Sequence, residues 1–390
     1  MLRRILLTVF LLGAGFCPAA DNNGEYFTEV YKQWKNGPPA DPGFFPIGVW
    51  LQEAGDAAAY KAAGINTYVA VRDGFKSKEI DKLKEAGMYL ICAQNETLLS
   101  RKEDKTIIAW LGKNEPDNMQ PVIYGRGSGT CLKPVVLISV YKEIKRNDTS
   151  RPVLANFGEG LVIDNYEGRG PGAALSDYKD YFKAGDIISF NVYPVAGRGS
   201  DNLIWYLGKG LDRITEFAGA DKIKWNFIET TVIKNPASKP KPANVRTEAW
   251  LSIIYGSKGL VYYTHKFKPD YDSRALLNDK EMLTAVTKLN AEIKEMAPVI
   301  NSPEAGGLTV SSGRNEPFIK TSIKKFKGDT YIFAVPTRSG KTAAKFELTG
   351  ISRETIAEVL GEARSVIISD KGIFKDIFEP WQVHVYKIAK

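Results

Sequence analysis

The sequence predicts an α/β fold, a (β/α)8 TIM barrel followed by a C-terminal antiparallel β-sandwich domain. Two observations carry this prediction. Short β-branched or aromatic runs alternate with amphipathic stretches over about 44–297, as in repeated βα units. After residue 303 the helical pattern stops, and short alternating strands follow one another across turns. We therefore expect a signal segment over 1–20, a barrel over 21–300 and a sandwich over 301–390.

The barrel prediction depends on eight candidate strands that are mostly separated by helical segments. These strands cover 45–50, 65–71, 88–94, 107–112, 152–157, 186–193, 224–230 and 259–265. Helical patterns at 56–64 and 77–87 end at Gly64 and Gly87, where a helix C-cap is expected before the next strand. Eight βα units over roughly 250 residues are the usual size of such a barrel. The third crossover, 95–106, is short, so we expect at most a couple of helical turns there.

The N-terminus predicts an exported protein. Residues 1–20 combine a basic start, an apolar run of about a dozen residues and small residues at the end, which is typical of a cleaved secretory signal. A lipoprotein signal is disfavoured because the bulky Phe16 precedes Cys17. We expect a secreted or periplasmic location. No other segment is long and apolar enough for an integral membrane span.

Composition argues against nucleic acid and metal as partners. Loss of Arg3 and Arg4 with the leader lowers the formal net charge from +8 to +6, and the remaining basic excess is spread along the chain. Two histidines leave little material for a histidine metal site or a serine-histidine triad. We expect no metal, no cofactor and a monomer. Cys92 and Cys131 could form one bridge or stay free.

A pair of carboxylates marks the predicted site. Asn114 and Glu115 follow the apolar run of the fourth strand, and Glu229 ends the seventh strand. The C-terminal ends of all strands of such a barrel meet at one mouth, where barrel enzymes place their chemistry. Two carboxyls about 5–5.5 Å apart perform retaining glycoside hydrolysis, one as neutral acid and the other as ionised nucleophile. The sequence therefore predicts a glycosidase that works through Glu115 and Glu229.

The segments around these carboxylates resemble retaining β-glycosidases of glycoside hydrolase clan A. The strongest match is AWLGKNEPD at 109–117, which is similar to the clan's Asn-Glu-Pro sequence at the end of strand four. The resemblance implies that Glu115 is the acid/base and that Asn114 binds the 2-hydroxyl of the substrate. It also implies that Glu229, in NFIETT, is the nucleophile and that Tyr193, in GDIISFNVYP, donates a hydrogen bond to it. The expected substrate is a β-linked glycan, with β-glucan as one candidate.

The resemblance covers roughly 45–297 and has two departures from the clan's pattern. Many members have histidine two residues before the strand-six tyrosine, whereas this chain has Asn191, which we include among the substrate-binding candidates. Strand eight ends in His265, Lys266 and Phe267 rather than in the tryptophan that often floors the sugar subsite. The family within the clan, the sugar and the linkage therefore stay open.

Further substrate-binding candidates stand at other strand ends. Arg72 could, together with Tyr193, hold the pKa of Glu229 down, or it could pair with Asp73 on the surface. His265 could contact sugar or orient a carboxyl, or it could fill the top of the barrel. Aromatic side chains suit the C–H faces of sugars, although they also pack barrel tops. The aromatic candidates are Trp50, Trp205, Tyr263 and Phe267.

Two alternative functions use the same residues. A carbohydrate-binding pseudoenzyme would hold glycan without cutting it, although the presence of both glutamates argues against this. A transglycosylase would form the same covalent intermediate and pass the sugar to a hydroxyl instead of water. The second domain carries no recognisable site pattern, so we expect it to pack on the barrel as a structural partner.

Overall fold

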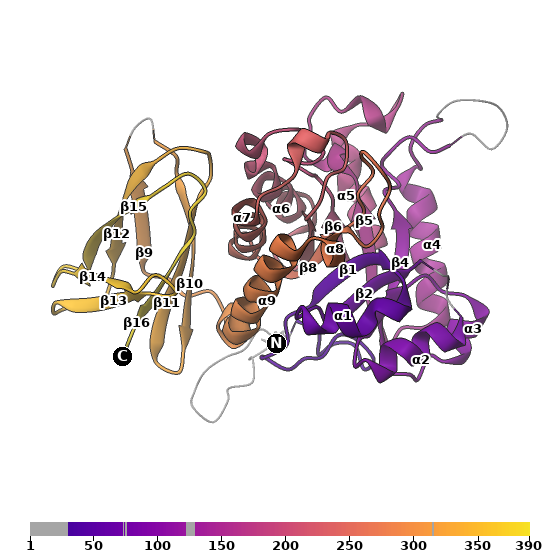
Figure 1. Cartoon of the computed structure of the whole chain (residues 1–390), viewed down its shortest axis with the longest axis horizontal. Coiled ribbons are helices and arrows are strands. Elements are labelled where there is room, and N and C mark those ends of the chain that lie inside the picture. The colour runs from indigo at the N-terminus through magenta and orange to yellow at the C-terminus, as the bar shows by residue number, and fades with distance from the viewer. Residues whose placement is uncertain (1–29, 73, 75, 122–128, 314–315) are drawn as a thin grey trace, which may run out of the picture.

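The computed structural model of the chain contains a closed eight-stranded barrel and a C-terminal pair of antiparallel sheets (Figure 1). The prediction of a (β/α)8 barrel followed by an antiparallel β-sandwich is therefore confirmed. The structure describes residues 30–390 except 73, 75, 122–128 and 314–315. The predicted leader at 1–20 lies outside the described residues.

All eight barrel strands run parallel in chain order, and the last one pairs with the first. The strands are β1 (Ile47–Gln52), β2 (Thr67–Val71), β3 (Tyr89–Cys92), β4 (Ile107–Asn114), β5 (Val153–Phe157), β6 (Ile187–Phe190), β7 (Ile223–Glu229) and β8 (Ser257–Tyr263). Alternate side chains of several strands form one buried cluster, to which β7 contributes Trp225 and Phe227. The Trp225 indole donates to the Tyr31 hydroxyl at 2.8 Å, so this large side chain is hydrogen-bonded within the core.

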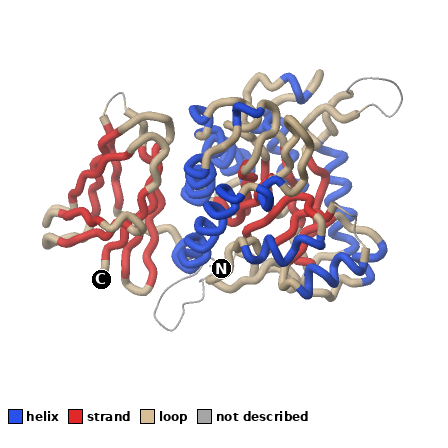
Figure 2. The backbone as a smooth tube through the Cα atoms, in the orientation of Figure 1, coloured by secondary structure: helices blue, strands red, loops and turns tan. Residues whose placement is uncertain are grey.

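Helices surround the strands of the barrel (Figure 2). They are α1 (Ala57–Ala62), α2 (Ser77–Glu85), α3 (Glu96–Ser100), α4 (Pro134–Asn147), α5 (Tyr178–Tyr181), α6 (Trp205–Ala218), α7 (Pro242–Ile254), α8 (Ala275–Asn278) and α9 (Lys280–Asn301). Short 3-10 turns cover Ala54–Asp56, Glu159–Leu161, Glu167–Arg169, Leu175–Asp177, Phe182–Ala184, Asp201–Leu203 and Pro236–Ser238. Gly64 and Gly87 follow α1 and α2 at φ of 79° and 64°, the left-handed conformation of the predicted C-caps. The short α3 agrees with the brief third crossover.

The C-terminal domain is built from two antiparallel sheets. Its strands are β9 (Leu308–Ser312), β10 (Ile319–Phe326), β11 (Asp329–Pro336), β12 (Thr342–Leu348), β13 (Thr355–Val359), β14 (Arg364–Ile368), β15 (Ile373–Phe378) and β16 (His384–Ile388). One sheet has the order β10-β11-β16-β13-β14 and the other β15-β12-β9. Phe346 of β12 stacks on its cross-strand partner Phe374 of β15 at 4.5 Å, and both rings contact Tyr386 of the other sheet, with centroids 5.5 and 5.2 Å apart. The domain therefore has a core of its own.

The sandwich packs against the flank of the barrel through α7 and α9, which lie between the two domains in Figure 1. Trp250 of α7 stacks on Phe333 of β11, with ring centroids 5.7 Å apart. The Thr247 hydroxyl donates to the carbonyl of Trp381 at 2.7 Å. The two faces of α7 are thus covered by the barrel and by the sandwich. None of the helices in the described part of the chain has the length and apolarity that crossing a bilayer requires.

Candidate active site

The first predicted carboxyl, Glu115, stands directly after β4 in a strained backbone conformation. Its φ is 44°, a left-handed value that a residue with a side chain seldom adopts outside functional sites and turns. The side chain is half-buried. Asn118 donates to Oε2 at 2.8 Å, and the amide of Asn191 donates to Oε1. Two side-chain amides therefore fix the direction of this carboxyl.

A chain of asparagines links Glu115 to neighbouring strands. The amide of Asn156, on β5, donates to the side-chain oxygens of Asn114 at 2.7 Å and Asn191 at 2.6 Å. Its own oxygen accepts from the Ser189 hydroxyl at 2.8 Å. Asn114 is exposed, and its amide N–H groups stay available to a substrate. Asn191, expected to bind substrate, contacts Glu115 directly. Asn156 was missed, although a polar residue inside the apolar run VLANF was a usable signal.

The second predicted carboxyl, Glu229, is fully buried at the end of β7. The backbone N–H groups of Val195 and Ala196, in the loop after β6, each donate to one of its oxygens at 2.6 Å. Burial raises the pKa of Glu229 to about 7, although these hydrogen bonds act to lower it. The expectation that Tyr193 and Arg72 hold this pKa down is therefore wrong, because the loss of solvent outweighs the stabilising contacts.

Glu248, on α7, is a third carboxyl beside Glu229 that sequence reasoning missed. It is fully buried, and a hydrogen bond from the backbone N–H of Glu229 acts to lower its pKa without offsetting that burial. Burial, followed by the charge of Glu229, raises the pKa of Glu248 well above its ordinary value. A hydrogen bond between the two carboxyls requires a proton on one of them, since two carboxylates contain no donor. We assign that proton to Glu248, the more strongly perturbed group.

Tyr193 lies near both predicted carboxyls without bonding to either. Its hydroxyl is buried and has no hydrogen-bond partner among residues that the structure describes. Its ring packs on Tyr263, with centroids 4.9 Å apart. Burial raises the pKa of Tyr193, and the charges of Glu115, Glu229 and Glu248 raise it further. The predicted hydrogen bond from Tyr193 to Glu229 is not formed in this structure, where the oxygens of Glu229 accept from the N–H groups of Val195 and Ala196.

His265 orients an aromatic side chain and contacts neither catalytic candidate. Its Nε2 lies 2.9 Å from the side-chain amide nitrogen of Gln52 and 3.1 Å from the carbonyl oxygen of Leu51. Its Nδ1 lies 3.3 Å from the Tyr271 hydroxyl. Burial lowers the pKa of His265 and keeps the ring neutral. Of the two readings open for His265, the structure supports packing at the barrel top, where it holds Tyr271 and flanks Tyr263 at 5.4 Å.

Arg72 and the remaining aromatic candidates lie in different places: some after β8, one in the barrel core and one on α6. The Arg72 guanidinium lies 5.1 Å from the ring centroid of Tyr271 and forms no ion pair with a described acid; Asp73 lies outside the described residues. Trp50 packs edge-on against Phe227 at 5.5 Å, as part of the barrel core. The exposed aromatic side chains after β8 are Phe267 and Tyr271, at 45% and 50% exposure. Trp205 begins α6 and packs on Tyr206.

A buried acid after Glu115 anchors the loop that follows β4. Asp117 accepts from the backbone N–H of Gly158 at 2.8 Å and from the hydroxyl of Tyr178. Burial raises its pKa to about 6.

Cys92 and Cys131 are both buried free thiols. The described residues contain no group of three or more His, Cys, Asp or Glu side chains that could hold a metal ion.

Comparison with known proteins supports the fold but no family. No protein family and no curated protein matches the sequence. Among solved structures, Gan42B, a GH42 β-galactosidase, aligns with 10% identity over 89% of this chain and 98% of its own, with a TM-score of 0.56. An α-amylase from Geobacillus thermoleovorans, solved with acarbose, aligns with 10% identity, 92% and 99% coverage and a TM-score of 0.55. An Anoxybacillus α-amylase aligns with 10% identity, 90% and 98% coverage and a TM-score of 0.53. At this identity the likeness shows the fold.

Proposed function

We propose that this protein is a glycoside hydrolase that cleaves β-linked glycans with retention at the mouth of the barrel. The observation that carries the proposal is the position of Glu115 directly after β4 and of Glu229 at the end of β7, two C-terminal strand ends of one closed parallel barrel. A carboxyl pair at a barrel mouth is the machinery of glycoside hydrolysis. Support for a sugar substrate also comes from the neighbours, which include a β-galactosidase and an α-amylase solved with acarbose.

In the proposed reaction Glu115 is the acid/base and Glu229 the nucleophile. An oxygen of Glu229 bonds to the anomeric carbon while the glycosidic bond breaks and Glu115 gives its proton to the leaving oxygen. Water then attacks the glycosyl ester, with Glu115 removing its proton and the Glu229 carboxylate leaving. Asn118 and Asn191 aim the carboxyl of Glu115. Asn114, held by Asn156, offers its amide to a substrate hydroxyl.

A second candidate function, glycan binding without cleavage, is favoured by one specific observation. Glu229 is fully buried, and both of its oxygens are occupied by the N–H groups of Val195 and Ala196. A nucleophile must reach the anomeric carbon, so hydrolysis requires this loop to move or to be displaced when substrate binds. If the loop is static, the mouth can only hold sugar.

The test is release of reducing ends from defined oligosaccharides: cellopentaose, laminaripentaose and xylopentaose, with maltopentaose as the α-linked comparison. Glu115→Gln and Glu229→Gln are compared with Glu159→Gln, which alters a carboxyl after β5 that pairs with Arg198. Loss of turnover in the first two alone supports the proposal. Binding with no turnover by the natural protein establishes the pure binder, and turnover of maltopentaose alone overturns the β-specificity.

The identity of the nucleophile and the location of the protein have separate tests. A 2-deoxy-2-fluoro glycoside should label Glu229, and a label on another carboxyl removes this assignment. We also propose that the protein acts outside the cytoplasm, on the basis of the 1–20 pattern. N-terminal sequencing of the exported protein checks this, and a mature chain that still begins at residue 1 contradicts it.

A further inference from the structure

The turn after β4 is tied to the rest of the barrel by a buried carboxyl. Asp117 lies two residues after Glu115 and is 1% exposed. Its Oδ1 and Oδ2 accept from the backbone N–H of Gly158 at 2.8 and 3.1 Å, and the Tyr178 hydroxyl donates to Oδ2. Gly158 directly follows β5, and Tyr178 begins α5. Asp117 therefore attaches the segment that carries Glu115 to β5 and to α5.

Gly158 connects this carboxyl to the side chain that aims Glu115. A Cβ atom at position 158 would lie 2.7 Å from both the Nδ2 and the Oδ1 of Asn118. The amide of Asn118 thus lies directly on the Cα of Gly158, and its Nδ2 donates to Oε2 of Glu115 at 2.8 Å. The φ of Gly158 is −85°, so the position favours glycine for close approach and not for its backbone conformation. Asp117, Gly158, Asn118 and Glu115 form one contiguous unit.

The backbone of Glu115 depends on support of this kind. Its φ of 44° is a left-handed value, which persists in a residue with a side chain where the surroundings enforce it. Its own N–H donates to the Asn156 carbonyl at 2.8 Å, which fixes the β4 side of the turn. The Leu132 N–H donates to the carbonyl of Pro116 at 2.9 Å, and Asp117 provides the next attachment. The turn is thus held at both ends, and Asp117 supplies the attachment that carries charge.

The strength of this attachment depends on the ionisation of Asp117. A proton removes the charge to which the Gly158 and Tyr178 donors are bound, so protonation weakens both hydrogen bonds. Burial raises the pKa of Asp117 to about 6, while these hydrogen bonds act to lower it and the charge of Glu115 to raise it. Ionisable side chains that face Asp117 from neighbouring elements are Tyr166, Tyr178 and Tyr181, with Arg169 6.0 Å from the Tyr178 ring. The attachment is therefore stronger above about pH 6 than below it.

We propose that Asp117 is a positioning residue for Glu115 and acts through the Gly158 N–H and the Asn118 amide. Because Asp117 is buried, it acts on the carboxyl of Glu115 and not on the sugar. This inference rests on the proposed function, in which Glu115 is the acid/base. It adds a selective consequence. When Asp117 is disturbed, the step that needs a proton from Glu115 slows, while attack by Glu229 does not.

The first test compares two substrates of the variant Asp117→Asn. The amide keeps one acceptor oxygen and places an NH2 group against a donor, so one attachment of the turn is lost. kcat/KM on the pentaose that the natural protein cleaves should fall about tenfold to hundredfold, as expected for a misplaced acid. kcat/KM on the dinitrophenyl glycoside of the same sugar should stay within about threefold, because its leaving group needs no proton. Equal losses on both substrates overturn the proposal.

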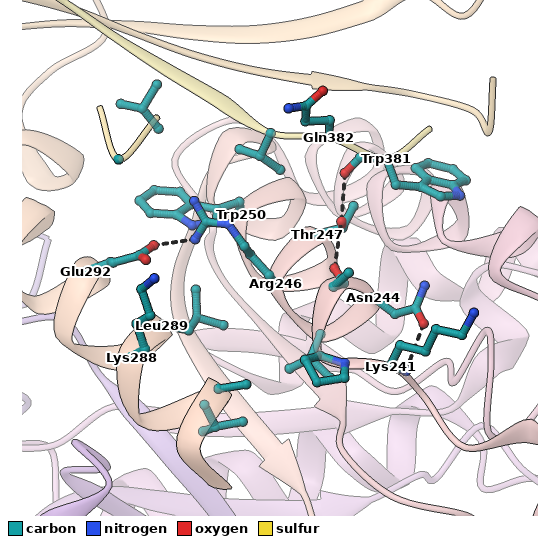
Figure 3. A pocket seen from close by; sticks show the side chains of 18 of the residues that line it. Lys241, Asn244, Arg246, Thr247, Trp250, Lys288, Leu289, Glu292, Trp381 and Gln382 are labelled. Atoms are coloured by element: carbon teal, nitrogen blue, oxygen red, sulfur yellow. Dashed lines mark hydrogen bonds and ion pairs between the residues drawn. The ribbon is translucent and has the colours of Figure 1, made fainter. Parts of the chain in front are cut away.

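Two controls measure the effect of losing buried hydrogen bonds elsewhere. Asp186→Asn is the matched control, because Asp186 accepts from the Val153 N–H and the Tyr141 hydroxyl, each at 2.9 Å, directly before β6. Thr247→Val removes the hydrogen bond to Trp381 between the two domains (Figure 3). Both variants should lower stability and change kcat/KM on the two substrates by the same factor. A selective loss on the pentaose in either control would contradict the proposal.

A second variant breaks the unit at its centre and leaves the carboxyl unchanged. Gly158→Ala places a Cβ where the Asn118 amide lies, so it should give the same selective loss on the pentaose. Gly55→Ala is its control, because a Cβ there meets no atom of the described chain within 4 Å. This pair also decides the question if Asp117→Asn does not fold. An unchanged ratio of the two kcat/KM values in Gly158→Ala excludes the link through Asn118.

Proton NMR tests the unit without turnover, so failure of the proposed function is distinguishable. In the natural protein the Gly158 amide proton and the side-chain amide protons of Asn118 should shift together, with a midpoint at about pH 6, the pKa of Asp117. Asp117→Asn should abolish both shifts, and the side-chain amide of Asn226, bonded to a serine, should not titrate with them. If no pentaose is cleaved but both resonances follow Asp117, the glycosidase proposal fails and the positioning of Glu115 stands. If Asn118 does not follow Gly158, the positioning role is overturned even where sugar is cleaved.

Discussion

The ends of β4 and β7 carry the same residue type in two opposite environments. Glu115 is half-buried and held by the side-chain amides of Asn118 and Asn191. Glu229 is fully buried, held by main-chain N–H groups and placed beside the carboxyl of Glu248. Both stand at the C-terminal end of a barrel strand. Strand position therefore brings a carboxyl to the mouth, and the neighbouring loops decide whether it can react.

The burial of Glu229 and Glu248 also determines how readily these two carboxyls are protonated. Burial raises the pKa of Glu229 to about 7 and that of Glu248 well above its ordinary value. At neutral pH a large share of Glu229 is therefore protonated, and a protonated carboxyl is no nucleophile. If Glu229 attacks the sugar, activity should increase as pH rises through about 7.

The largest expected effect is that of changing Glu115, the half-buried carboxyl at the end of β4. Glu115→Gln removes the acid/base, and kcat/KM on a natural glycan should fall by about 10³-fold, within the usual range for such groups. Steady-state kinetics measures this, with Glu159→Gln as the control. Activity within a few-fold of the natural protein would remove Glu115 from the mechanism and would leave the barrel mouth without its proposed acid.

The second prediction separates the asparagine chain from ordinary core packing. Asn156→Ala leaves the oxygens of Asn114 and Asn191 without a donor, and we expect a loss of about 2 kcal/mol of unfolding free energy and of most activity. Asn226→Ala is the matched control, since the side chain of this buried β7 asparagine bonds, among the described residues, to Ser252 and to its own strand. It should cost similar stability and leave kcat nearly unchanged. Equal loss of activity in both variants would contradict the orienting role of Asn156.

The third prediction concerns the buried pair Glu229 and Glu248 and follows from the direction in which their pKa values shift. Glu229 and Glu248 have pKa values above 4.5 in the folded protein, so the folded state binds more protons than the unfolded state between pH 4.5 and about 7. Stability is therefore fully present below pH 4.5 and lost as pH rises through the folded pKa. The variant Glu248→Gln keeps a hydrogen-bond donor for Glu229 in its amide group and removes the ionisable carboxyl of residue 248.

Denaturant unfolding of Glu248→Gln measures this effect. We expect the variant to be more stable than the natural protein by about 1–2 kcal/mol at about pH 8, with a smaller difference at about pH 4. Glu292→Gln is the control, because that carboxyl pairs with Arg246 in a partly exposed position. Stabilisation that is equal at both pH values would contradict a raised pKa of Glu248 in the folded protein.

Sequence patterns predicted one side of the site better than the other for physical reasons. Alternating apolar runs located all eight strands, and the carboxyls followed from their ends. The contacts to Glu229 come from the backbone of Val195 and Ala196, and backbone N–H groups leave no mark in a sequence. A helical glutamate such as Glu248 suggests solvent exposure, yet this side chain is buried beside Glu229 at the end of β7.

The smallest expected effect, and the one that sharpens the comparison most, is that of Tyr193→Phe. The hydroxyl it removes is buried and has no described partner, so stability should be unchanged or higher by up to about 1 kcal/mol. Since the hydroxyl does not bond to Glu229 here, kcat should change by less than about threefold if this arrangement is the reactive one. Kinetics and thermal unfolding of the single variant measure both quantities. A loss of kcat above about a hundredfold, with normal stability, would mean that Tyr193 bonds to Glu229 during turnover. Each oxygen of Glu229 accepts one backbone N–H and has a second lone pair, so a shift of the Tyr193 ring could add this bond while the contacts to Val195 and Ala196 remain.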